Sequence, residues 1–76
     1  MQIKITELKR LTLEAVDVNG DPIPAYQIAG DIGIHPSTFS KYCLGQREIP
    51  WQHRELIASY FGVDGAILDQ MVTVDA

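Results

Sequence analysis

The sequence is poor in residues that form covalent or metal cross-links. Its 76 residues include one cysteine, Cys43, and two histidines, His35 and His53. A single cysteine excludes an internal disulfide, and one thiol with two imidazoles is too few for a structural zinc site. The histidines also lack a nucleophile partner of the kind that hydrolases use. We therefore expect no metal and no cofactor, and a protein of the reducing cytoplasm.

Long apolar stretches are missing as well. The longest uninterrupted apolar runs span about three residues. A membrane-spanning helix needs roughly 20 apolar residues, and the apolar region of a signal peptide needs roughly 7 to 15. No basic n-region followed by a cleavage site is present in the sequence. We expect a soluble protein that has no membrane partner.

Catalytic patterns are absent too. The sequence has no carboxylate pair, Ser-His-Asp set or glycine-rich phosphate loop with convincing placement. The length suits one small domain, residues 1–76, which offers little concave volume for a substrate. We therefore expect a binding protein rather than an enzyme, and no small-molecule ligand.

Positive charge is scarce, and it is unevenly distributed. Six lysines and arginines stand against ten acids, for a net charge of −4. The stretch from His35 to Arg54 holds three basic residues and one acid, a local charge of +2, and the rest of the chain carries −6. Because a nucleic-acid binder gains affinity by neutralising phosphates, the middle of the chain suits that role best. The excess is small, which indicates weak or dimer-dependent binding.

Apolar spacing predicts a series of helices. Leu8, Leu11, Ala15 and Val18 recur at three- and four-residue intervals and form one face of a helix over residues 3–18. The two prolines that follow favour an extended connector. Further helices are expected from about residue 24 to 33, from 35 to 45 and from 50 to 61, with a short turn at 64–71 and an unassigned tail at 72–76.

The junction between the second and third expected helices has the pattern of a helix-turn-helix. Ala29 is small enough for two helices to cross closely, and Gly33 allows the positive φ that a tight turn needs. Ile34 is expected to fill the space beneath the turn. Pro36 suits the first position of the next helix. The first half of that helix would project from the body with small polar side chains, a geometry that reaches base edges in DNA.

Residues 27–45, followed by Gln46, Arg47, Pro50 and the run I-A-S-Y-F-G-V, resemble the Cro and lambda-repressor (XRE-type) helix-turn-helix family. The resemblance covers roughly residues 8–68. It implies a compact all-α fold of five helices. It also implies a transcription regulator of phage, prophage or bacterial type that binds a double-stranded DNA operator as a homodimer.

The resemblance further implies two groups of DNA-contacting residues. Pro36, Ser37 and Lys41 match the family's base-reading positions, and Ser40 adds a second hydroxyl nearby. Lys41 can donate to guanine O6 and N7, whereas hydroxyls pair with any base and proline offers only apolar contact. We expect sequence choice to depend on Lys41 and on DNA shape. The positions that match phosphate contacts are Tyr26, Gln27, Thr38, Gln46 and Arg47.

Three features depart from the family pattern. Cys43 stands where glutamate is frequent, Leu44 replaces a polar residue, and the connector before Pro24 is longer and richer in proline. None of these features breaks the turn.

A second interpretation stays open beside DNA binding. The acidic surface also suits a protein–protein interaction module that keeps the helix-turn-helix body and binds DNA weakly or not at all. Under this alternative Lys41 is an ordinary solvated charge. Under either one, Phe39, Tyr42 and Trp51 are expected in the core, and Tyr60 is a candidate for a subunit contact.

Overall fold

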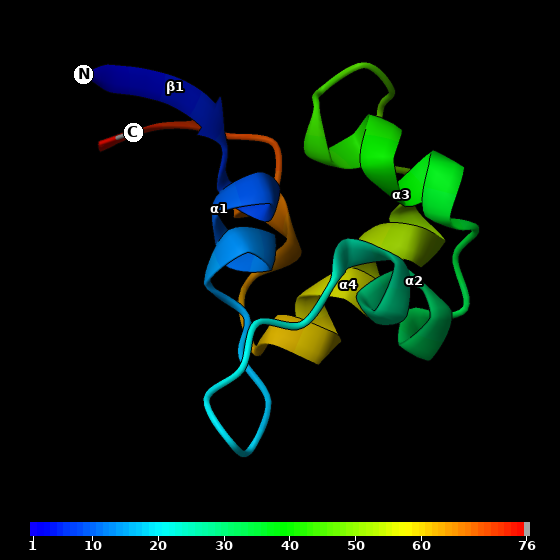
Figure 1. Cartoon of the computed structure of the whole chain (residues 1–76). Helices are drawn as coiled ribbons and strands as arrows, with labels where there is room; N and C mark the ends of the chain where they lie inside the picture. Colours follow the sequence, from blue (N-terminus) through cyan, green and yellow to red (C-terminus); the bar gives the residue numbers. More distant parts are fainter. Residues whose placement is uncertain (76) are drawn as a thin grey trace.

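The computed structural model describes residues 1–75, which form four α-helices, one short 3-10 helix and a two-stranded antiparallel sheet (Figure 1). The fold is therefore mixed α/β, and the expected all-α fold of five helices is wrong. The two strands lie side by side next to α1. In chain order the elements are β1 (Gln2–Thr6), α1 (Glu7–Glu14), α2 (Ala25–Ile32), α3 (Pro36–Cys43), α4 (Trp51–Phe61), η1 (Gly65–Ile67) and β2 (Met71–Asp75).

The two strands pair because their side chains alternate between apolar and polar residues. The register sets Ile3 opposite Val74 and Ile5 opposite Val72. Since side chains on a strand point to opposite faces in turn, these four aliphatic residues share one face of the ribbon. The other face carries polar side chains, among them Lys4, and one apolar residue, Met71.

The missed strands have a simple physical origin. The helix predicted over residues 3–18 was inferred from the helical spacing of the leucines and was extended back to residue 3. In that first segment, however, apolar residues recur at every second position, as in a strand. The tail at 72–76 contains the same alternation, but it is too short to indicate a strand without its partner. It forms β2 as far as Asp75, and Ala76 lies outside the described residues.

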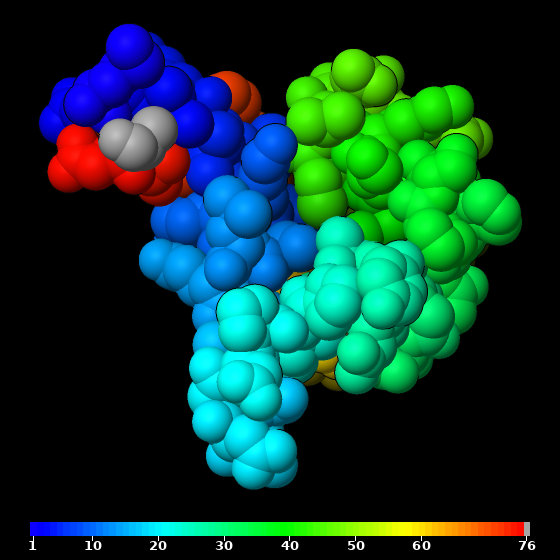
Figure 2. Space-filling model, viewed as in Figure 1, coloured from blue at the N-terminus to red at the C-terminus, as the bar shows by residue number. Residues whose placement is uncertain are grey.

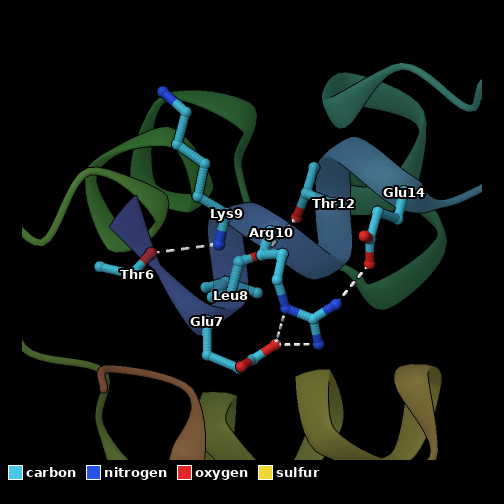
Figure 3. Close-up of polar contacts among 7 residues, drawn as sticks. All are labelled: Thr6, Glu7, Leu8, Lys9, Arg10, Thr12 and Glu14. Atoms are coloured by element: carbon cyan, nitrogen blue, oxygen red, sulfur yellow. Dashed lines mark hydrogen bonds and ion pairs between the residues drawn. The ribbon is translucent and has the colours of Figure 1, made fainter. Parts of the chain in front are cut away.

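Thr6 sets the start of α1. Its Oγ1 accepts a hydrogen bond of 3.1 Å from the backbone amide of Lys9, which satisfies one of the free amides of the first turn. Arg10 pairs with Glu7 and with Glu14, one turn away on either side (Figure 3). Such pairs support a short helix by a few tenths of a kcal/mol each, roughly 0.2 to 0.5.

α1 ends earlier than the apolar spacing predicts. The carboxylate of Asp17 accepts hydrogen bonds from the amides of Asn19 and Asp21, at 2.8 and 3.0 Å. These bonds close the hairpin that projects from the body in Figure 1, a local geometry that aspartate favours over helix. Val18, expected on the buried face of a helix, is fully exposed in this hairpin.

The turn between α2 and α3 forms where it was predicted. Gly33 has a left-handed backbone with φ 88°, and its amide and that of Ile34 both donate to the carbonyl oxygen of Ala29 at 2.9 Å. Ile34 is buried beneath the turn, and Ala29 is fully buried. The turn therefore closes α2 and starts α3 from a position that the core fixes.

The core lies where the four helices and η1 meet. Phe39 of α3 is its largest fully buried side chain, and Tyr42 lies beside it. Burial of apolar area of this kind is the main term that stabilises a chain of this size. The cluster consists of Leu8, Ile28, Ala29, Ile34, Phe39, Tyr42, Cys43, Ile49, Ile57 and Leu68.

Trp51 is not part of the core, where the sequence pattern predicted it. It is the first residue of α4, and its side chain is 68% exposed. α4 buries Ile57 and Ala58 instead. At 100° per residue, Trp51 lies about 120° around the helix from Ile57 but only about 20° from Ala58, so its position around α4 does not explain its exposure. An exposed tryptophan stands at the start of α4.

We predict opposite effects of alanine at two glycines of the same segment. A Cβ at Gly33 or at Gly30 would meet nothing within 4 Å, so neither substitution clashes. Gly33→Ala must hold alanine at φ 88° and should lower the free energy of unfolding by about 1 to 2 kcal/mol. Gly30 lies within α2, so Gly30→Ala should raise the free energy of unfolding by about 0.5 to 1 kcal/mol. Urea denaturation of both variants tests this, and equal effects would contradict it.

Candidate nucleic-acid interface

α3 has one buried and one exposed face. Phe39, Tyr42 and Cys43 recur at three- and four-residue spacing and point into the core. The rest of the helix lies at the surface, where Figure 2 shows this segment in green on the outer flank of the molecule. The residues predicted to read bases are all exposed, and they are Pro36, Ser37, Ser40 and Lys41.

Local interactions define the start of α3. Pro36 occupies the first helical position, where its missing amide hydrogen would have no partner. The Nδ1 atom of His35 accepts a hydrogen bond of 3.2 Å from the amide of Ser37. The imidazole thus caps the helix. The exposed hydroxyl of Ser37 has no hydrogen-bond partner among the described residues.

Two hydrogen bonds hold the other end of α3 against the body. The Thr6 hydroxyl donates to the carbonyl oxygen of Cys43 at 2.6 Å, across 37 residues of sequence. The Tyr42 hydroxyl shares a hydrogen bond of 2.8 Å with Nδ1 of His53 on α4. The end of α3 is therefore tied to β1 and to α4, so its exposed face has a defined orientation.

Cys43 belongs to the packing beneath α3. Its side chain is buried, and its sulfur lies 3.8 Å from the hydroxyl of Thr12. Burial raises the pKa of the Cys43 thiol, so the thiol stays neutral at physiological pH. Its role is that of a small apolar residue.

The residues predicted to contact phosphate occupy two places. Tyr26 and Gln27 are exposed in the first turn of α2. Gln46 and Arg47 are exposed in the loop that follows α3. Thr38 is half-buried and is the least exposed residue of the group. The fold thus places exposed polar residues before and after the base-reading helix.

Lys4 and Lys9 are basic residues near α3 that the sequence did not indicate. A shallow cavity of about 220 Å³ separates β1 and α1 from the end of α3, and its lining includes Lys4, Lys9 and Leu44. The Lys9 side chain extends away from the ion pairs of Arg10 (Figure 3). Its charge acts on the thiol of Cys43 at the end of α3. No sequence signal could have found this pair, because only the fold brings these lysines to that helix.

Arg54, by contrast, does not belong to this surface. Its guanidinium donates to the carbonyl oxygen of Gly65 at 2.7 Å and pairs with Asp69 at 3.1 Å. The charge of +2 calculated for residues 35–54 included Arg54, but this cation is paired in the structure. The basic groups around α3 are instead Lys4, Lys9, Lys41 and Arg47.

Comparison with protein-family models, with curated proteins and with solved structures finds no match to this chain. No helix in the described part of the chain is long and apolar enough to cross a membrane. Within residues 1–75, no group of three or more His, Cys, Asp or Glu side chains is placed to hold a metal ion.

We predict that the Thr6 hydroxyl stabilises the attachment of α3. Thr6→Val keeps the shape of the side chain but removes both the cap of α1 and the donor to Cys43, and should lower the free energy of unfolding by about 2 to 3 kcal/mol. Thr6→Ser keeps the hydroxyl and should cost about 1 kcal/mol or less. Urea titration measures both. Equal losses would show that the methyl group contributes as much as the hydroxyl and would contradict the prediction.

Proposed function

We propose that this protein is a sequence-specific DNA-binding transcription regulator of the Cro and repressor type, which places α3 in the major groove. The observation that supports this most directly is the division of α3 into a buried apolar face and an exposed face of small polar residues and one lysine. A helix of this kind, held by its inner face, can enter a groove that admits one helix.

The side chains on the outer face set what α3 can read. Lys41 is the only charged residue within α3, and it can donate to guanine O6 and N7. Ser37 and Ser40 can donate to or accept from several base edges, and Pro36 can contact a thymine methyl group. Direct readout by such a set is permissive, so DNA shape contributes to the choice of operator.

Contacts to the DNA backbone would come from residues on both sides of α3. Arg47 supplies a cation in the loop after the helix, and Tyr26 supplies a hydroxyl at the start of α2. Lys4 and Lys9 add positive charge near the end of α3. Contacts of this type position a protein on the duplex and make its affinity depend on salt.

A second candidate function is a protein–protein interaction module, and the net charge of −4 favours it. Phosphate contacts release counterions, so the affinity of a DNA complex falls steeply between about 50 and 200 mM salt. A complex with a protein partner depends far less on salt. A salt series on whichever complex forms therefore separates the two functions.

We predict that Lys41→Ala weakens binding to a duplex enriched from a random pool by about 1 to 3 kcal/mol and relaxes its base preference. Fluorescence anisotropy measures the affinity. Val18→Glu is the matched control, because it changes the net charge by the same amount at a fully exposed position in the hairpin. An equal loss in both variants would assign the effect to net charge, and no loss in Lys41→Ala would remove α3 as the reader. Failure to enrich any duplex would reject DNA binding.

We also propose that the protein acts as a homodimer, since one small recognition helix rarely supplies enough specificity. Within residues 1–75 the sheet has two strands only, so each strand has one unpaired edge. A two-fold axis at Lys4 of β1 would set two lysines directly opposite each other, which is unfavourable. An axis at Thr73 of β2 sets two threonines opposite each other and brings Val72 of one copy beside Val74 of the other. The β2 edge is therefore the favoured dimer surface.

We predict that Thr73→Lys shifts the protein toward monomer, because the two-fold arrangement would then place two lysines together. Gln2→Lys adds the same charge to the other strand of the ribbon and should leave the dimer intact. Sedimentation velocity at several concentrations measures both. A wild-type protein that stays monomeric throughout, or a Thr73→Lys variant that dimerises equally well, would contradict the proposal.

A further inference from the structure

A groove of about 820 Å³ runs between α4 and η1, outside the surface proposed for DNA. One wall is α4 and the other is η1 with the residues beside it. The groove is larger than the cavity beside Lys4 and Lys9, and DNA binding through α3 gives it no role. Its lining comprises Trp51, Arg54, Glu55, Ala58, Ser59, Asp64, Gly65, Ala66 and Asp69.

Arg54 forms the floor of the groove. Its side chain is 15% exposed and crosses from α4 to η1, where it bonds the carbonyl oxygen of Gly65 and the carboxylate of Asp69. A Cβ at Gly65 would lie 2.9 Å from Cγ of Arg54, so a larger residue would displace the arginine. The ion pair lowers the pKa of Asp69 and keeps it charged. The side chain of Arg54 is therefore held in place, and its positive charge is neutralised by Asp69.

Trp51 forms one rim of the groove with an indole that the core does not use. It is 68% exposed, and Glu55 follows it one helical turn later on the same side of α4. A large exposed aromatic side chain is costly to leave in water, and such residues frequently anchor a partner. The indole face also attracts cations, more strongly when a carboxylate lies nearby.

The free charge of the groove is negative. Arg54 and Asp69 neutralise each other, whereas the carboxylates of Glu55 and Asp64 have no cation among the salt bridges of residues 1–75. Asp64 caps η1 by accepting from the amide of Ala66 at 2.9 Å, and it remains an anion. A local charge of −2 repels nucleic acid and anionic lipid, and it attracts a cationic partner.

We propose that this groove binds a peptide segment of a protein partner that carries arginine or lysine. The cation lies over the indole of Trp51 and pairs with Glu55 and Asp64, and neighbouring aliphatic side chains of the peptide cover Ala58 and Ala66. This site is independent of DNA binding and gives the chain a second partner. An open groove with an aromatic rim and unneutralised carboxylates suits an extended cationic segment better than an acidic or neutral one.

Selection from a library of random short peptides tests the proposal although the partner is unidentified. Immobilised wild-type protein is the bait, and Trp51→Ala protein is used to remove peptides that bind elsewhere. We expect enriched peptides to carry net positive charge and aliphatic residues. Enrichment of acidic peptides, or no enrichment above the Trp51→Ala bait, would overturn the proposal.

Titration of one enriched, fluorescently labelled peptide separates the contributions of the rim. Trp51→Ala should weaken binding roughly tenfold or more, and Glu55→Gln should weaken it about two- to fivefold. Leu13→Ala is the control, because Leu13 is 65% exposed but does not line the groove, and the affinity of this variant for the peptide should equal that of the wild type. An equal loss in Leu13→Ala would contradict a specific role for the groove.

Two further outcomes distinguish this site from the proposals above. If the wild-type protein enriches no DNA duplex but binds a peptide, DNA binding is rejected and the groove proposal is supported. Sedimentation of Trp51→Ala without peptide tests whether a second copy of the chain fills the groove. If this variant alone loses a wild-type dimer, the groove is a subunit contact and the peptide proposal is wrong.

Discussion

The left-handed backbone at Gly33 is the constraint on which the placement of α3 depends. It lets the amides of two successive residues donate to the carbonyl oxygen of Ala29, so α2 ends there and α3 begins after a turn of three residues. Ile34 then enters the core, and Phe39 follows on the inner face of α3. The polar outer face of α3 is exposed as a consequence, since a helix with one apolar face has one orientation against a core. Thr6 and His53 hold the far end of the same helix.

The two proposed binding surfaces carry charges of opposite sign. Lys41 lies on α3, Arg47 lies in the loop after it, and Lys4 and Lys9 line a cavity with Leu44 at its end, although the chain as a whole is acidic. In the groove between α4 and η1 the only cation, Arg54, is already paired, which leaves carboxylates. An acidic protein can therefore present a basic surface to DNA and an acidic groove to a cationic peptide.

The sequence was informative where local spacing and the core agree. Gly33, Pro36 and the apolar spacing of α3 and α4 predicted the ends of those helices to within two residues, because each signal acts within a few positions. The strands depended on a partner almost 70 residues away, and neither half of such a ribbon is stable alone. The candidate site divides in the same way. The outward face of α3 was predicted, whereas the approach of Lys4 and the exposure of Trp51 arise only from packing.

The role of α3 as the DNA-reading helix is tested most directly by the change in backbone amide NMR signals when an enriched DNA duplex is added to the protein. We expect the largest changes on residues 36–41, with further changes at the start of α2 and in the loop after α3. Signals of the hairpin at residues 17–21 should stay in place. Tight binding that leaves the signals of residues 36–41 unchanged would contradict the account, whichever other part of the chain responded.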